Sequence, residues 1–142
     1  MRIRWIVSLV PVAGLAVALL AQQPAGGATP GSPAQVIEIT AKKYEYSPSE
    51  IRVKKGTKVQ LKVRALDRSH GMEFELYPEG ADKSGPQGLV FTPEQKNYKL
   101  EKGEERVIEF VAERPGTYSF KCSVFCGFGH RGMRGKLIVE EK

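Results

Sequence analysis

Alternating apolar and polar residues mark several short segments of this 142-residue chain. In the clearest of them every second residue is apolar: Val59, Leu61, Val63 and Ala65. A period of two is typical of a β-strand with one buried face. Similar alternation, or a run of β-branched residues, predicts further strands at residues 36–39, 51–53, 72–76, 106–111, 117–122 and 136–140.

Turn-forming residues separate these segments, as in Lys55-Gly56-Thr57 and Pro115-Gly116. The pattern contains no long amphipathic helix. Short strands with turn signals between them predict an all-β fold, an antiparallel sandwich of seven or eight strands. Residues 78–95 are interrupted by Pro and Gly, and we expect them to cross between the sheets as a long irregular loop.

The first part of the chain has a different character. Arg2 and Arg4 precede an uncharged apolar run, residues 5–21. This is the pattern of a secretory signal. Leu19-Leu20-Ala21 is a mediocre cleavage site, and Ala25-Gly26-Gly27-Ala28 offers another. The run is slightly shorter than the about 20 residues that span a bilayer, and an uncleaved anchor remains the alternative. Either case predicts a periplasmic or otherwise extracytoplasmic protein.

Pro, Gly, Ala and Ser then dominate up to Ala34, which indicates a flexible linker. We therefore divide the chain into three parts. Residues 1–28 hold the signal peptide or N-terminal anchor with the start of the linker, residues 29–34 are the flexible linker, and residues 35–142 form one folded domain. A domain of this length is enough for one modest core.

The chain carries a formal net charge of +6, or +4 without Arg2 and Arg4. Basic residues are scattered among acidic ones, which indicates solubility. Steering toward an acidic redox partner is the second interpretation. An exported chain without a concentrated basic stripe is not expected to bind nucleic acid.

The most informative segment is residues 122–133, Cys-Ser-Val-Phe-Cys-Gly-Phe-Gly-His-Arg-Gly-Met. It contains both cysteines, one of two histidines and one of three methionines: Cys122, Cys126, His130 and Met133. Thiolates, imidazole and thioether are soft ligands that suit copper far better than magnesium or calcium. The other histidine, His70, lies upstream in Asp67-Arg68-Ser69-His70-Gly71 and is a candidate to complete the site.

The spacing of these four residues would also fit one face of a helix. Interspersed glycines oppose that interpretation, because each costs a helix up to about 1 kcal/mol relative to Ala. The flanking residues 118–120 and 137–139 are strand-like. We therefore predict a tight loop that joins two strands and holds a preorganised set of metal ligands.

The pattern Cys-x3-Cys-x3-His-x2-Met, with a histidine about fifty residues upstream, resembles the CuA site of the cupredoxin domain found in cytochrome c oxidase subunit II and in nitrous-oxide reductase. The segment Tyr46-Ser-Pro-Ser-Glu-Ile-Arg-Val-Lys-Lys-Gly56 resembles a common cupredoxin opening. The resemblance covers residues 35–142 and implies a Greek-key sandwich with two copper ions, or one ion as the alternative. A single-copper blue protein has a similar loop but needs only one cysteine.

The resemblance also implies a ligand assignment. Cys122 and Cys126 would bridge both coppers, with His70 and Met133 completing one copper. His130 and the backbone carbonyl of Val124 would complete the other. Family members often have glutamate where Val124 stands, and in the oxidase that carboxylate also meets a magnesium ion at a subunit interface. Its absence, together with a single apolar N-terminal segment, favours a stand-alone domain over an oxidase subunit.

Two other chemistries fit parts of the pattern. Cys122 and Cys126 could form a structural disulfide, as exported cysteines often do, but a disulfide explains neither His130 nor Met133. A zinc site is a further alternative, although the spacing differs from that of the common zinc finger and zinc has no use for Met133. Phe125 and Phe128 either tune the site and shape a docking surface or cap the end of the sandwich.

Three classes of function remain. The leading hypothesis is an electron-transfer protein that accepts an electron from a cytochrome c or a small copper protein. The second is a copper chaperone or store that holds Cu(I) for delivery to an oxidase. The third is an enzyme, but copper enzymes usually need a further histidine-rich site, and His70 and His130 are already assigned. We therefore expect no catalysis by this chain alone, and a role as one component of an oxidase or reductase stays open.

Overall fold

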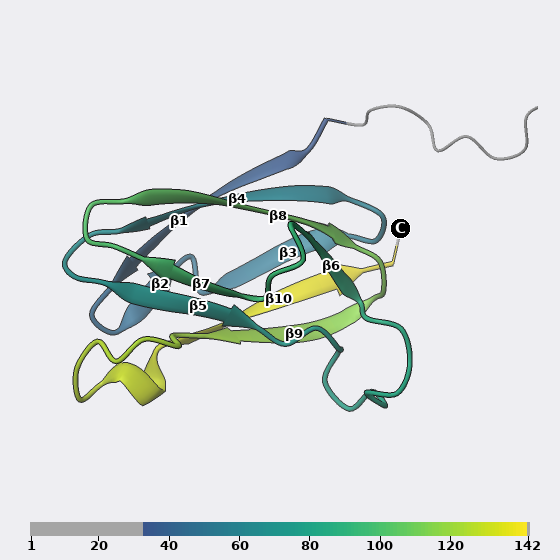
Figure 1. Cartoon of the computed structure of the whole chain (residues 1–142). Coiled ribbons are helices and arrows are strands. Elements are labelled where there is room, and N and C mark those ends of the chain that lie inside the picture. The colour runs from purple at the N-terminus through teal and green to yellow at the C-terminus, as the bar shows by residue number, and fades with distance from the viewer. Residues whose placement is uncertain (1–32, 142) are drawn as a thin grey trace, which may run out of the picture.

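The computed structural model describes residues 33–141, which form ten strands and one turn of 3-10 helix (Figure 1). The predicted signal or anchor, residues 1–28, lies outside the described residues, as does most of the predicted linker. The elements are β1 (Gln35–Lys42), β2 (Glu45–Ser47), β3 (Glu50–Lys54), β4 (Lys58–Ala65), β5 (His70–Phe74), β6 (Leu89–Thr92), β7 (Asn97–Leu100), β8 (Glu105–Ala112), β9 (Gly116–Lys121), η1 (His130–Gly132) and β10 (Arg134–Glu140).

The strands form two facing sheets of five, in the orders β2-β1-β4-β8-β6 and β3-β10-β9-β5-β7. This confirms the predicted all-β sandwich. The sheets are mixed instead of purely antiparallel, since β1 runs parallel to β4 and β3 runs parallel to β10. The chain passes repeatedly from one sheet to the other, so that strands adjacent in sequence need not pair.

The number of strands is ten, and the prediction of seven or eight was too low. The additional elements are β2, β6 and β7, each of only three or four residues. Strands this short leave too few alternations to stand out from a loop. β6 also falls inside residues 78–95, the segment expected to be irregular throughout.

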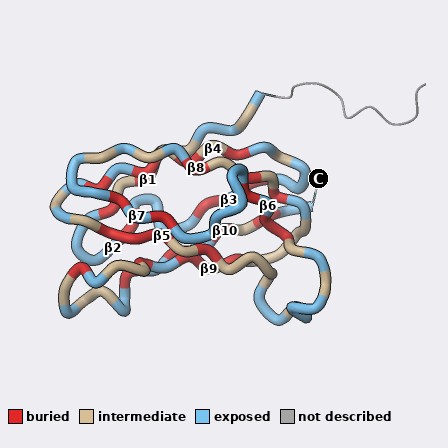
Figure 2. The backbone as a smooth tube through the Cα atoms, viewed as in Figure 1, coloured by how far each residue is buried: buried red, intermediate tan, exposed pale blue. Residues whose placement is uncertain are grey.

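Buried positions recur along the strands of both sheets (Figure 2). Strand β4 illustrates the pattern, because its burial alternates along its length and Leu61 is fully inaccessible. At the centre of the core, the ring of Phe74 lies 5.1 Å from that of Phe91 and 5.6 Å from that of Phe120, centroid to centroid. Burying each such side chain contributes about 1.5–3 kcal/mol to the free energy of unfolding. These packed rings hold the two sheets together at a fixed spacing.

The topology determines where the ligand loop, residues 122–133, lies. Strands β9 and β10 are antiparallel neighbours, so the loop leaves and returns at the same end of the sandwich (Figure 1). Strand β5 pairs with the other side of β9, also antiparallel, with Glu73 opposite Lys121. The beginning of β5, where His70 stands, therefore extends past the end of β9 and lies beside the start of the ligand loop, as the contact of Gly71 with Ser123 shows. In the described part of the chain, no helix is both long and apolar enough to cross a bilayer.

Candidate metal centre

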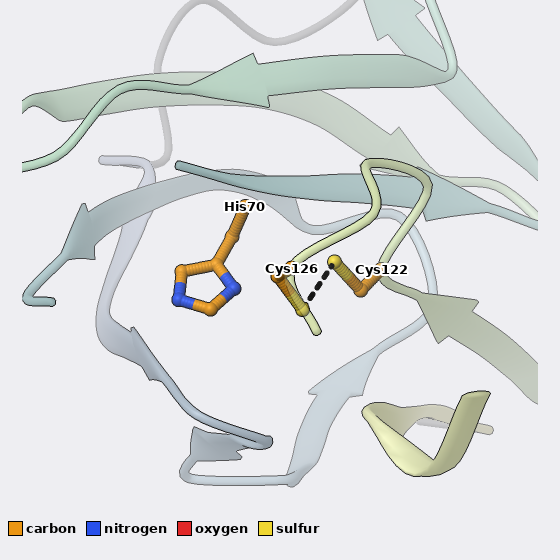
Figure 3. A group of neighbouring side chains, drawn as sticks. All are labelled: His70, Cys122 and Cys126. Carbon is orange, nitrogen blue, oxygen red and sulfur yellow. Dashed lines mark hydrogen bonds between the residues drawn. The ribbon is translucent and has the colours of Figure 1, made fainter. Parts of the chain in front are cut away.

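Three potential metal ligands converge at this end of the sandwich. The ligand atoms of His70, Cys122 and Cys126 all lie within 4.8 Å of one another, and all three residues are buried (Figure 3). The two sulfur atoms are 3.6 Å apart, and both cysteines are free thiols. The topology thus joins residues some fifty positions apart, as the pairing of β5 with β9 requires.

The orientation of the His70 ring is fixed by hydrogen bonding. Its Nε2 lies 2.7 Å from Oδ1 of Asp67, and Oδ2 of Asp67 accepts the backbone N–H of Lys43 at 2.9 Å. An ionised carboxylate only accepts hydrogen bonds, so Nε2 carries a proton, and in the neutral form of the ring Nδ1 presents a lone pair. Asp67 therefore orients the imidazole of His70.

The other ring nitrogen supplies a test of whether the site fits a metal. Nδ1 of His70 is buried and has no hydrogen-bond partner among the described residues. Figure 3 shows one ring nitrogen of His70 on the side of the cysteines. A buried nitrogen without a partner is unusual in a folded protein. A soft metal between His70, Cys122 and Cys126 would satisfy it, so these residues fit copper.

Asp67 is ionised at neutral pH. Burial opposes its ionisation, but the hydrogen bonds from His70 and from the Lys43 backbone outweigh that effect and bring the pKa of Asp67 to about 2. A carboxylate that donates electron density to a histidine in this way is a common arrangement behind metal ligands.

Met133 and the backbone of Val124 also approach the cluster. Sδ of Met133 lies 3.9 Å from Sγ of Cys126, and the Met133 side chain is fully buried. The carbonyl oxygen of Val124 lies 3.1 Å from Sγ of Cys122. The N–H of Cys122 donates to the carbonyl of Met133 at 3.0 Å, which closes the base of the ligand loop.

His130 occupies a different position from the other predicted ligands. It begins η1 and does not belong to the compact cluster of His70, Cys122 and Cys126 in the described structure. Its ring lies 6.0 Å from that of Phe125, centroid to centroid. Its Nδ1 is buried and has no hydrogen-bond partner among residues 33–141. Five of the six predicted donors thus lie close together: His70, Cys122, the Val124 carbonyl, Cys126 and Met133. The sixth, His130, lies outside this group, and its Nδ1 lacks a hydrogen-bond partner among the described residues.

Three residues near the cluster had no role in the sequence prediction. The hydroxyl of buried Tyr46 donates to the Gly71 carbonyl at 2.5 Å, and the Gly71 N–H donates to Sγ of Cys122 at 3.3 Å. Nη1 of Arg68 donates to the carbonyl of Cys126 at 2.5 Å. Each contact joins residues at least 25 positions apart, so only the folded structure reveals it.

Burial controls the protonation of the site. It raises the pKa of Tyr46, and the two cysteines raise it further. Burial likewise raises the pKa of the Cys126 thiol, and neighbouring Cys122 adds to the effect. Both cysteines must lose their protons to bind a metal, so metal binding at this site releases protons.

The two phenylalanines of the ligand loop do not cap the core. Phe125 is 73% exposed and Phe128 is fully exposed, and their rings meet edge to face at 6.4 Å. They form an exposed apolar tip on the loop that carries the two buried cysteines. Between Cys122 and Val139 the sequence contains basic residues and no acidic ones, and Arg131 lines the same shallow surface pocket as both phenylalanines.

Comparisons with known proteins agree with the fold. The family model described as cupredoxin-like domain matches residues 11–139. Cytochrome c oxidase subunit 2 of Thermus thermophilus is 27% identical over 105 residues, which cover 74% of this chain and 65% of that protein. In a second Thermus thermophilus subunit 2 the match covers 52% of the protein. Nitrous-oxide reductase of Ralstonia nicotianae is 27% identical over 108 residues, covering 73% of this chain and 14% of the reductase.

Solved structures are similar as well. A heme-copper terminal oxidase dimer determined by cryo-EM has a chain that is 25% identical, with a TM-score of 0.54, coverage of 75% of this chain and 65% of that chain. The blue copper protein auracyanin A of Chloroflexus aurantiacus is 20% identical, with a TM-score of 0.56 and coverage of 76% and 100%. The second likeness concerns the fold alone. The chain thus spans less than two thirds of the oxidase subunits it matches.

Proposed function

Because the chain belongs to the cupredoxin-like domain family, we propose that it is a copper protein that carries electrons. The observation that supports this most directly is the buried Nδ1 of His70, which has no hydrogen-bond partner among residues 33–141 and lies beside the sulfurs of two free cysteines. The family model adds support, since the residues that it matches include the ligand loop. The similarity to an oxidase subunit 2 and to a nitrous-oxide reductase agrees with a role in electron transfer.

We propose a binuclear centre as its form. Cys122 and Cys126 bridge the two coppers, His70 and Met133 complete one of them, and His130 with the Val124 carbonyl completes the other. A copper pair joined by thiolates spreads one unpaired electron over both metals and therefore changes little in geometry when an electron arrives. The support for a second ion is the second unsatisfied buried nitrogen, Nδ1 of His130, in the same loop.

The protein's own residues hold the ligands and keep water out. His70, Cys122, Cys126 and Met133 are each at most 4% exposed, so solvent does not compete for the metal. Asp67 fixes the imidazole of His70, and the N–H of Gly71 donates to Sγ of Cys122. Such hydrogen bonds and the apolar surroundings set the electron affinity of a copper–thiolate site.

One geometric observation favours a second function. The compact cluster contains His70 and both cysteines, with Met133 adjacent, and His130 stands outside it. Three or four soft donors without His130 suffice for a single Cu(I) ion. In that case the protein would be a copper chaperone or store that delivers Cu(I) to an oxidase.

Copper loading of the purified protein distinguishes the two functions. For electron transfer we expect two coppers per chain and a paramagnetic resonance spectrum with hyperfine splitting from both copper nuclei. Cys126→Ser should destroy or convert this spectrum, and His130→Ala should lower the stoichiometry to one. A single, colourless and readily exchanged Cu(I) in the wild type would contradict the binuclear proposal and favour delivery. Zinc binding in preference to copper would contradict both.

We propose an extracytoplasmic location, with residues 1–28 as signal or anchor, because the charged and apolar pattern of the N-terminus has that form. The chain would serve as a stand-alone carrier or as one component of an oxidase or reductase, with catalysis in another subunit. Fractionation of cells that express the full chain tests the location, and N-terminal sequencing of the mature protein distinguishes cleavage from anchoring.

The apolar tip of Phe125 and Phe128 is proposed as the contact for a redox protein such as a cytochrome c or a small copper protein. Basic residues Lys121, Arg131 and Arg134 surround the same end, and only Glu73 opposes them in the adjoining polar pocket. This charge favours a partner with an acidic surface, since opposite charges accelerate encounter.

Small redox probes of opposite charge test the effect of these arginines. Replacing Arg131 and Arg134 with Gln should slow electron transfer to anionic ferricyanide at low salt and leave transfer to cationic hexaammineruthenium unchanged or faster. Lys54→Gln with Lys55→Gln, in the turn at the opposite end of β10, is the matched control. If both double variants changed the two electron-transfer rates equally, the net charge of the protein, and not the position of the arginines, would explain the effect.

A further inference from the structure

Two separate loops bring the candidate ligands together. The β4–β5 loop, residues 66–69, leads directly into His70, and the ligand loop carries both cysteines. One side chain bridges the two loops: Nη1 of Arg68 donates to the carbonyl oxygen of Cys126 at 2.5 Å, across 58 positions of sequence. Charged donors form shorter and stronger hydrogen bonds to oxygen than neutral ones do.

The position of this bond in the ligand loop is informative. The residue after Cys126 is Gly127, whose φ of +125° lies in a region that other residues rarely adopt. Glycine moves freely among such conformations, so the peptide between Cys126 and Gly127 is a place where the loop can reorient. Arg68 holds the carbonyl of that same peptide. The bond therefore restrains the direction in which the Cys126 side chain leaves the backbone.

The neighbour of Arg68 restrains the opposite side of the site. Asp67 binds Nε2 of His70 and the N–H of Lys43. Two consecutive residues of the β4–β5 loop thus act on two candidate ligands. Asp67 orients His70, and Arg68 holds the backbone of Cys126. Gly129, further along the ligand loop, lies against the ring of Tyr44, where an added Cβ would come within 2.2 Å of the ring. The β1–β2 connection supports the loop from that side.

From these contacts we infer that Arg68 is a positioning residue, which holds the Cys126 peptide in its metal-binding orientation before the metal arrives. Arg68 is itself exposed and supplies no metal ligand. Its effect is to reduce the number of loop conformations that must be lost when the metal binds. A preorganised ligand set binds more tightly than a mobile one for this reason.

Hydrogen–deuterium exchange of the metal-free protein tests the inference without copper. Arg68→Met should accelerate exchange in residues 124–133, where the amides of His130, Gly132 and Met133 donate hydrogen bonds within the loop. Exchange in β4 and β8 should stay unchanged, because strand pairing protects the amides of those strands. Arg68→Lys, which keeps a cationic donor with a shorter reach, should give an intermediate rate. Arg64→Met is the matched control, since Arg64 is an exposed arginine on the outward face of β4.

Copper affinity supplies the second measurement, and this part rests on the proposed function. Arg68→Met should weaken copper binding by about 10- to 100-fold, the range found for residues that orient metal ligands. Arg64→Met should match the wild type. A wild type that binds no copper would refute the proposed function and leave the exchange result valid.

Several outcomes would overturn the role of Arg68. If residues 124–133 of Arg68→Met exchanged at the wild-type rate, that role would be refuted. The same acceleration of exchange in Arg64→Met would also refute it. If Arg68→Met fails to fold, Arg68→Lys is compared with Arg64→Lys, and equal exchange in these two variants would likewise refute it.

Discussion

At the scale of single residues, Gly71 is the most constrained position around the centre. Its N–H donates to Sγ of Cys122 and its carbonyl accepts the hydroxyl of Tyr46. A Cβ at this position would lie 2.2 Å from Oγ of Ser123 and 2.7 Å from the backbone nitrogens of Ser123 and Val124. The hydroxyl can rotate away, but the backbone nitrogens cannot move without displacing the ligand loop.

We therefore expect Gly71→Ala to lower the free energy of unfolding by about 1–3 kcal/mol, as for overpacked cores. Copper affinity should fall as well, because Ser123 and Val124 lie between the two cysteines. Gly132→Ala is the matched control in the same loop, since a Cβ there meets nothing within 4 Å. Urea denaturation of both variants measures the difference, and equal losses would contradict the steric argument.

The residue types in the sequence predicted which side chains are candidate metal ligands. They did not predict which residues hold those ligands in position. Cys122, Cys126 and Met133 are recognisable because soft donors are rare and here lie close in sequence. The roles of Arg68, Tyr46 and Gly71 depend on contacts that form only when β5 packs beside β9. An exposed arginine or a buried tyrosine has no sequence signal that separates it from others of its type.

At the scale of elements, β4 is the strand whose prediction and structure agree best. It lies between β1 and β8, with Leu61 opposite Ile37 and Ile108. Because Leu61 is fully buried and Lys62 faces outward, Leu61→Ala should cost about 2–5 kcal/mol of unfolding free energy. Lys62→Ala should change it by less than about 0.5 kcal/mol. Guanidinium denaturation measures both, and a comparable cost for Lys62→Ala would refute the assigned faces.

The elements that sequence reasoning missed share physical causes. β2, β6 and β7 are too short for alternation to be recognised, and β6 follows a loop rich in Gly and Pro. The parallel pairs β1–β4 and β3–β10 depend on the chain crossing between sheets. A strand's own residues specify its buried face but not the direction of its neighbour.

At the scale of the whole molecule, the packing of the sandwich leaves few tyrosines accessible. Burial raises the pKa of Tyr98 to about 12, and it also raises the pKa values of Tyr46 and Tyr118. Tyrosines in an unfolded chain ionise near pH 10. Between these values the unfolded chain releases protons that the folded protein keeps. The free energy of unfolding should therefore be unaffected by these groups below about pH 10 and fall as the pH rises toward 12.

Tyr98 allows this alkaline sensitivity to be measured. Its hydroxyl donates to the carbonyl of Gln95, so Tyr98→Phe should lose about 0.5–1.5 kcal/mol at neutral pH. Between pH 10 and 12 the free energy of unfolding should fall less in this variant than in the wild type. The reason is that the variant lacks the buried hydroxyl of Tyr98, which keeps its proton in the folded protein. Half-buried Tyr77, replaced with Phe, is the control. Urea midpoints at each pH, with tyrosinate absorbance, provide the measurement, and identical alkaline slopes for wild type and Tyr98→Phe would contradict the assigned burial of Tyr98.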